Sequence, residues 1–283
     1  MKPLSDWPDA DRRQITGVFT DIDDTLTTEG AITPDALQAL GALKAAGLHV
    51  IPITGRPVGW SIPFAQGDLA RGVAPWPVDA IVAENGAVAI FTSQNGPQTP
   101  PDKPKPLSKL YQQDATTRAA NYARMQQVAQ RVLREVPGAQ LSQDSWGRET
   151  DIAIDHSEFA HLSADKIDQA VAIMQSEGMN ATVSSIHING WFGEHNKLVG
   201  ARWIVRELFG RDLDTEISQW VYVGDSTNDQ LMFEHFPHSI GVANIRRFEA
   251  LLTHKPAHIT LAERGAGFAE VAQALLRSRQ AAR

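Results

Sequence analysis

The chain alternates short apolar segments with amphipathic ones, and this alternation limits the possible folds more than any other feature. Residues 33–47 predict a helix that Thr33 caps, that begins at Pro34 and that Gly47 ends. Apolar segments with the character of buried strands lie at residues 15–20, 48–54 and 78–84. Strands that alternate with helices at this spacing predict βαβ units and therefore a parallel sheet.

The alternation is interrupted in the middle of the chain. Residues 92–106 are rich in proline and cannot form regular structure for long. Helices are expected at 114–135 and 164–177 and strands at 150–155 and 181–188, and the alternating pattern resumes from residue 196 to a last helix at 266–279. We therefore expect an α/β protein with a doubly wound, Rossmann-like core (residues 1–86 and 190–283). An α+β cap domain (residues 87–189) is inserted into it.

Composition narrows the function classes. The 283 residues carry a formal net charge of −7 with 42% hydrophobic residues, which favours a folded acidic protein over a general nucleic-acid binder. The absence of cysteine excludes disulfides and thiolate chemistry. Neither a signal-peptide core nor an apolar run long enough for a membrane helix is present, so we expect a cytoplasmic protein that binds no membrane.

Polar side chains follow four of the predicted strands. They lie in the sequences DIDDT (21–25), TGR (54–56), ENG (84–86) and DSTND (225–229). Because ligands of open α/β sheets bind at the carboxyl ends of the strands, we expect these residues to share one pocket. Its ligands would all be oxygen atoms, which a hard cation such as Mg²⁺ prefers.

Carboxylates packed this closely repel one another, and a divalent cation would keep them ionised. An ionised aspartate beside Mg²⁺ can attack a phosphoryl group whose charge the metal and a lysine neutralise. A second carboxyl group two residues further on can donate a proton to the leaving oxygen and then accept one from water.

Four segments in this order resemble the motifs of the haloacid dehalogenase superfamily: DIDDT after a strand, TGR after a strand, Lys197 at the start of a helix, and GDSTND at 224–229 after a strand. The position of the insertion, with ENGA at 84–87 before it, is similar to the type-II, Cof-like or IIB capped branch. That branch includes phosphatases of sugar phosphates, such as the sucrose-phosphate and mannosyl-phosphoglycerate enzymes. The motifs cover the core, whereas the cap resembles the branch in size and element mix only.

The resemblance implies a role for each matching residue. Asp21 is the nucleophile, and Asp23 is the general acid and base whose backbone carbonyl also binds Mg²⁺. Thr54 hydrogen-bonds the transferred phosphoryl group, and Lys197 neutralises it and orients Asp21. The remaining metal positions implied by the resemblance, besides Asp21 and Asp23, are Asp225, Asn228 and Asp229. Asp24 stands where glycine is common in the family and receives no chemical role.

Several further residues are candidates for substrate contact. Gly55 and Arg56 follow Thr54, and Arg56 is either a substrate contact or half of a structural ion pair. Asn85 lies at a strand end beside the predicted site, where a simple turn is the alternative. In the cap, Arg148 suits a second anionic group of the substrate, although an exposed surface arginine would look the same in the sequence.

The function expected from these residues is that of a Mg²⁺-dependent phosphatase of a small phosphorylated metabolite, a sugar phosphate by preference. A phosphomutase would need the same core, and a phospho-accepting switch like a response-regulator receiver would also use Asp, Thr, Lys and Mg²⁺. The switch has no use for a cap of about 100 residues or for Asp23 as an acid. We expect the cap to close over the site during transfer. Substrate identity and oligomeric state are not predicted.

Overall fold

A computed structural model describes residues 1–92 and 106–280 of the chain. Its centre is a six-stranded sheet in the order β1-β15-β14-β13-β2-β5, with parallel pairing throughout. The strands are β1 (Lys2–Pro3), β2 (Gly17–Thr20), β5 (His49–Pro52), β13 (Trp220–Gly224), β14 (His238–Gly241) and β15 (His258–Ile259). Consecutive residues of a strand face opposite sides of the sheet, so Val18 belongs to one hydrophobic cluster and Phe19 to the other.

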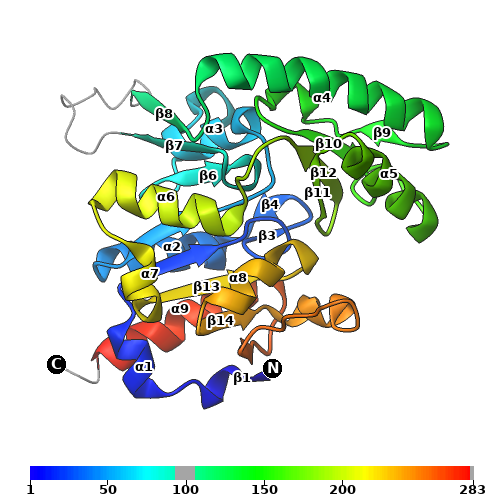
Figure 1. Ribbon diagram of the computed structural model, residues 1–283. Coiled ribbons are helices and arrows are strands. Elements are labelled where there is room, and N and C mark those ends of the chain that lie inside the picture. The colour runs from blue at the N-terminus through cyan, green and yellow to red at the C-terminus, as the bar shows by residue number, and fades with distance from the viewer. Residues whose placement is uncertain (93–105, 281–283) are drawn as a thin grey trace.

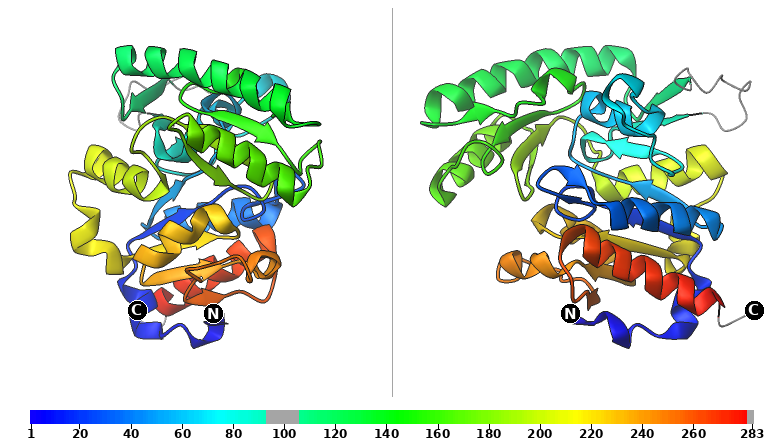
Figure 2. Two further views of the ribbon diagram at one scale, coloured as in Figure 1. Left: turned by 45° about the vertical axis from the view of Figure 1, so that its right-hand side comes forward. Right: turned by 180° about the vertical axis from the view of Figure 1, so that it is seen from behind.

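Helices cover both faces of this sheet (Figures 1 and 2). One cluster includes residues of α2 (Pro34–Ala45), α3 (Val58–Gln66) and α9 (Arg264–Gln280), and α1 (Asp9–Gln14) packs against α9. The opposite cluster includes residues of α6 (Lys197–Phe209), α7 (Leu213–Glu216) and α8 (Gln230–His235). This arrangement confirms the predicted doubly wound α/β core.

Three more strands extend the sheet beyond β5. A parallel bridge joins Ile53 to Val82 in β6 (Ile81–Ala83), and β7 (Val88–Thr92) and β8 (Leu107–Tyr111) follow in antiparallel pairing. The predicted insertion began at residue 87, which is too early, because strand pairing attaches β7 and β8 to the core. Most of the proline-rich stretch at 92–106 lies outside the described residues.

A second, antiparallel sheet has the order β11-β12-β10-β9. Its strands are β9 (Gln140–Leu141), β10 (Ile152–Asp155), β11 (Asn180–Val183) and β12 (His187–Trp191), and its helices are α4 (Ala115–Glu135) and α5 (Ala164–Ser176). Both helices pack on the face that carries Ile154 and Ile188. The other face carries His187 and Asn189 and is turned toward the core. We call residues 115–191 the cap; the single strand expected at 181–188 proved to be the hairpin of β11 and β12.

The cap touches the core on two sides. Near the start of α3, Gly59 and Gly147 approach so closely that a Cβ on Gly59 would lie 2.6 Å from the Cα of Gly147. Elsewhere, the Thr227 hydroxyl donates a hydrogen bond to the carbonyl of Val183 at 2.8 Å. Two small elements complete the core, the hairpin of β3 (Thr27–Thr28) and β4 (Ala31–Ile32). Among the described residues, no helix is long and apolar enough to cross a membrane.

Candidate active site

The carboxyl ends of three neighbouring strands bring the main site residues together. Asp21 follows β2, Thr54 follows β5 and Asp225 follows β13, and β2 lies between the other two strands. Lys197 is the first residue of α6, whose N-cap is Asn196. The sequence motifs, up to 208 residues apart, therefore meet at one edge of the sheet.

Lys197 is held between two carboxylates. Its Nζ donates to Oδ1 of Asp21 and to Oδ1 of Asp229, each at 2.6 Å, and the side chain is only 3% exposed. The Tyr222 hydroxyl donates to the same Asp229 oxygen. Burial would lower the pKa of the Lys197 ammonium, but Asp21 and Asp229 outweigh it and raise that pKa above its ordinary value. Lys197 is therefore a fixed positive charge beside Asp21.

Asp225 lies close to Asp21 and is fully buried. Its Oδ2 accepts a hydrogen bond from Nδ2 of Asn244 at 3.0 Å, and the same amide donates to the carbonyl of Asp24. Burial, together with the carboxylates of Asp21 and Asp229, raises the pKa of Asp225 well above its ordinary value. Asn244 thus connects the loops that follow β2, β13 and β14.

The three buried carboxylates fit a divalent cation. Oxygen atoms of Asp21, Asp225 and Asp229 lie within 4.8 Å of one another. When all three are ionised, their negative charges exceed the single positive charge of Lys197 by two. Burial raises the pKa of Asp21 to about 7 even though Lys197 opposes it. Hard oxygen donors with this charge excess are what Mg²⁺ requires.

The carboxylates do not contribute equally. Asp229 accepts four hydrogen bonds: from Lys197 and Tyr222 at one oxygen, and from the backbone amides of Asp225 and Ser226 at the other. Because its oxygens are occupied, Asp229 orients Lys197 and the loop that follows β13. Asp21 and Asp225 are better placed to bind a metal directly. Asn228, the other implied metal position, accepts a hydrogen bond from the Ser226 hydroxyl at 2.7 Å.

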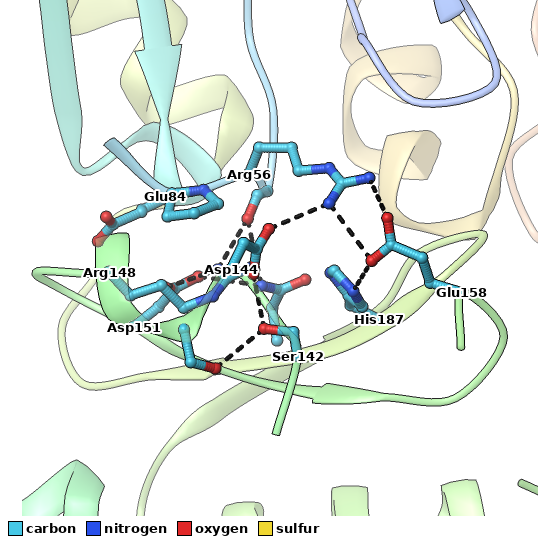
Figure 3. A network of polar contacts seen from close by, with 12 residues as sticks. Arg56, Glu84, Ser142, Asp144, Arg148, Asp151, Glu158 and His187 are labelled. Atoms are coloured by element: carbon cyan, nitrogen blue, oxygen red, sulfur yellow. Dashed lines mark hydrogen bonds and ion pairs between the residues drawn. The ribbon is translucent and has the colours of Figure 1, made fainter. Parts of the chain in front are cut away.

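Asp23 is bound to Arg56. The guanidinium donates to both Asp23 oxygens at 2.9–3.0 Å. It also contacts Asp144 and Glu158 of the cap at 3.1 and 2.8 Å (Figure 3). Glu158 in turn contacts His187 at 2.8 Å. Of the two interpretations of Arg56, the structure shows the ion pair, which links the core to the cap directly above Asp23.

The loop 54–56 is held from both sides. The backbone amide of Arg56 donates to the Thr54 hydroxyl oxygen at 3.0 Å, and the amide of Asn85 donates to the Thr54 carbonyl at 2.9 Å. A Cβ on Gly55 would lie 3.1 Å from Oδ1 of Asn189, so the cap rests almost on this glycine. Asn85 itself has a left-handed backbone (φ 55°), and within the described residues its buried Nδ2 has no hydrogen-bond partner. Both residues lie beside the position expected for a phosphoryl group.

Arg148 does not stand open to a ligand as the sequence interpretation supposed. It is 5% exposed, and its guanidinium donates to Asp151 at 2.8–2.9 Å, to Asp144 at 3.1 Å and to the carbonyl of Gly55 at 2.9 Å (Figure 3). Neighbouring backbone amides at 149 and 150 donate to the buried carboxylate of Glu84. Arg148 therefore lies in the interface between cap and core, bound to groups of the protein.

Two cavities adjoin these residues. One of about 330 Å³ is lined by Asp23, Arg56 and Glu158 and by the hairpin that follows Asp24. Another of about 470 Å³ is lined by Lys197, Asn85 and Asn228 together with residues of β11. Both lie between the core and the cap, the first beside Asp23 and the second beside Lys197.

Some site residues were missed in the sequence. Tyr222 lies inside an apolar strand, where nothing distinguishes it from a core residue. Asn244 follows the end of β14, and the same rule of strand ends could have indicated it. Glu84 was visible in ENGA, but its contact with the backbone of residues 149–150 joins two segments that only the folded chain brings together.

Comparisons with known proteins agree with this geometry. A family model described as haloacid dehalogenase-like hydrolase matches residues 18–114. No curated protein matches the sequence.

Solved structures resemble the whole chain. The sucrose-phosphatase of Synechocystis sp. PCC6803, solved with sucrose and phosphate, has a TM-score of 0.62 and 14% identity over 93% of this chain and 98% of its own. A trehalose-6-phosphate phosphatase related protein has a TM-score of 0.58 and 14% identity over 94% and 98%. A sugar phosphatase of subclass IIB has a TM-score of 0.55 and 14% identity over 94% and 98%. At these identities the likeness shows the fold.

The doubly wound core, the cap above its strand ends and the buried aspartates together define a capped α/β fold with an acidic site at the ends of its strands. Residues 18–114 match the haloacid dehalogenase-like hydrolases, and the chain shares its fold with the solved phosphatases named above. This match favours an enzyme over the receiver-like switch, the alternative from the sequence.

Proposed function

We propose that the protein is a Mg²⁺-dependent phosphatase that hydrolyses a sugar phosphate through an aspartyl-phosphate intermediate on Asp21. The observation that carries the proposal is the contact of Lys197 with Asp21 at 2.6 Å inside a buried carboxylate cluster. A nucleophile is thereby placed beside a fixed cation. When bound, Mg²⁺ would supply positive charge to Asp21, Asp225 and the phosphoryl oxygens.

The residues divide the reaction into two displacements. An oxygen of Asp21 forms a bond to phosphorus while the bond from phosphorus to the leaving oxygen breaks, and Asp23 gives that oxygen a proton. Water then attacks the phosphorus of the aspartyl phosphate and gives a proton to Asp23, which releases phosphate and restores Asp21. Lys197 and the Thr54 hydroxyl stabilise the phosphoryl oxygens in both steps.

Asp23 can reach the leaving oxygen only after it separates from Arg56. The guanidinium also holds Asp144 and Glu158, so it retains two carboxylate partners when Asp23 turns away. Arg56 therefore keeps its charge compensated in both positions of Asp23, which lowers the cost of the movement.

The surroundings of Asp23 favour a leaving group that carries hydroxyl groups. The cavity of about 330 Å³ is lined by carboxylates, among them Glu29 and Glu158, and its two arginines are already paired, Arg56 as above and Arg264 with Asp24 at 3.1 Å. Carboxylates accept hydrogen bonds from hydroxyls and repel a second anion. Phe159, 61% exposed at the same cavity, offers an apolar face to a sugar ring. The sucrose-phosphatase and subclass IIB sugar phosphatase among the similar structures agree with this substrate class.

A phosphate-release screen tests the proposal. The purified protein is assayed against phosphorylated sugars, phosphorylated carboxylic acids and p-nitrophenyl phosphate, with Mg²⁺ and with a chelator. We expect Mg²⁺-dependent release that is fastest with sugar phosphates, and a loss of at least about a thousandfold in kcat for Asp21→Asn. Asp214→Asn, on an exposed helix, is the matched control and is expected to keep wild-type activity. Hydrolysis that persists in Asp21→Asn would refute the nucleophile.

A further inference from the structure

We infer that Arg148 and Asn189 of the cap are positioning residues that orient the Thr54 hydroxyl through the peptide bond between Gly55 and Arg56. The inference rests on the proposed function, because it concerns the group that would hydrogen-bond the phosphoryl oxygen. Two cap side chains converge on one core carbonyl: Arg148 donates to the Gly55 oxygen at 2.9 Å and Asn189 at 3.3 Å.

This carbonyl belongs to the same peptide unit as the Arg56 amide. A trans peptide is planar, so its C=O and N–H groups point in opposite directions. With the Gly55 oxygen directed at the cap, the Arg56 N–H is directed at the Thr54 hydroxyl oxygen, 3.0 Å away. The hydroxyl oxygen therefore accepts a hydrogen bond from within the loop, which leaves its proton to be donated to a ligand.

The peptide needs this support because it follows a glycine. Gly55 lacks a Cβ, and the backbone after such a residue can adopt more conformations than it can after any other. The preceding peptide is fixed differently, since the Asn85 amide donates to the Thr54 carbonyl from the core side. The core thus fixes the peptide group between Thr54 and Gly55, and the cap fixes the peptide group between Gly55 and Arg56.

The cap residues are themselves held rigidly. Asp151 is fully buried and accepts hydrogen bonds from Arg148 at 2.8 and 2.9 Å and from Asn189 at 3.0 Å. On the core side, the Glu84 carboxylate accepts hydrogen bonds from the backbone amides of residues 149 and 150, directly after Arg148. These contacts hold Arg148 and Asn189 in place, so that their donor groups stay directed at the Gly55 carbonyl.

A double-mutant cycle tests the inference. Arg148→Gln combined with Asp151→Asn removes both charges of the buried ion pair and the Arg148 donor, while Asp144 keeps its contact with Arg56. Thr54→Val removes the hydroxyl while keeping its shape. With p-nitrophenyl phosphate and Mg²⁺, we expect the cap pair to lower kcat/KM by about tenfold or more, mostly through kcat, because the affected contact is to the reacting group. In the Thr54→Val background the cap pair should cost less than about twofold, since the hydroxyl it orients is already absent.

Two further variants keep the test decisive. Asn189→Ala removes the weaker donor and leaves the Arg148–Asp151 pair intact, so it serves if the double substitution does not fold; it is expected to lose about threefold in kcat/KM, again only where Thr54 is present. Tyr111→Phe removes a core hydrogen bond to Glu149 of the same segment without touching Gly55, and it should keep kcat/KM within about twofold of wild type.

The outcomes separate the inference from the proposed function. If the wild-type enzyme is active but the losses of the cap substitutions and of Thr54→Val multiply when they are combined, only the positioning role is overturned. The same conclusion follows if the cap variants keep full activity or if Tyr111→Phe loses as much as they do. A wild-type protein that hydrolyses no phosphomonoester overturns the proposed function and this inference with it.

Discussion

His195 shows what burial imposes on a single titratable side chain. It lies two residues before Lys197, stacked on Trp191 with ring centroids 5.5 Å apart. Within the described part of the chain, neither ring nitrogen has a hydrogen-bond partner. Burial alone lowers the pKa of His195 to about 4, so the folded protein holds the ring neutral.

The acid stability of the protein should depend on this histidine. Because its folded pKa lies below the ordinary 6.5, the unfolded chain takes up a proton first, and stability falls as pH decreases from about 6.5 to 4. Between pH 7 and pH 4.5 the unfolding free energy of wild type should fall by about 2 kcal/mol more than that of His195→Phe. Urea unfolding at the two pH values measures the difference.

The matched control is the exposed His161. His161→Phe should show the same pH dependence as wild type. If His195→Phe also shows the wild-type dependence, the ring is protonated in the folded state and its burial has another compensation.

Site residues that belong to a sequence motif could be predicted, whereas residues whose contacts join distant segments of the chain could not. Asp21, Thr54, Lys197 and Asp225 could be predicted because each follows a recognisable strand or begins a helix. Arg148 could be named but not placed, since its partners Asp151 and Gly55 are set by how the cap lies on the core.

At the scale of elements, α6 is positioned by two glycines. A Cβ on Gly200 would lie 2.5 Å from the Cα of Gly86, and Gly86 has a left-handed backbone with φ 106°. The helix thus approaches the segment after β6 closely enough to bring Lys197, one turn earlier, to Asp21.

Glycine-to-alanine substitutions in two helices should have opposite effects. Alanine in a helix interior normally stabilises by up to about 1 kcal/mol relative to glycine. Gly41→Ala in α2 should show this gain, because its Cβ meets nothing closer than 3.8 Å. Gly200→Ala should instead lose about 2 kcal/mol or more through overlap with Gly86, and should lower kcat/KM as Lys197 shifts.

Thermal unfolding and kinetics of the two variants check this expectation. Gly41→Ala provides the control, with a higher melting temperature and wild-type kinetics. A stabilised, fully active Gly200→Ala would mean that the contact between α6 and the segment after β6 is not tight.

The helices and strands of the core were predictable because hydrophobic periodicity and glycine or proline boundaries marked them. The N-terminal elements β1 and α1 were missed, since two- and six-residue elements carry little periodic signal. The boundary of the cap was misplaced because β7 and β8 join the sheet by antiparallel pairing, which depends on long-range partners rather than on local pattern.

The stability of the whole molecule depends on the buried negative charge at the carboxyl ends of the core strands. The cluster of Asp21, Asp225 and Asp229 exceeds the charge of Lys197 by two, and burial raises the pKa values of Asp21 and Asp225. A bound divalent cation should therefore stabilise the entire fold, since binding to the native state alone adds to the unfolding free energy.

Mg²⁺ should raise the melting temperature at neutral pH by several degrees, corresponding to about 3 kcal/mol at a hundredfold excess over Kd. Asp225→Asn should be at least as stable as wild type without metal, because one buried carboxylate is gone, yet gain little from Mg²⁺. Differential scanning fluorimetry with Mg²⁺, with a chelator and with NaCl at matched ionic strength measures both effects. An equal Mg²⁺ response in Asp225→Asn would place the metal elsewhere.

The convergence of two cap side chains on the Gly55 carbonyl bears on how such a protein can be re-engineered. Transplanting a foreign cap would exchange a wall of the cavity beside Asp23 and, with it, a support of the loop 54–56. A chimera should therefore inherit Arg148, Asp151 and Asn189 as one block, together with Glu84 beneath them. The cap is therefore not an independent module at this point, because its side chains hold the backbone of the core.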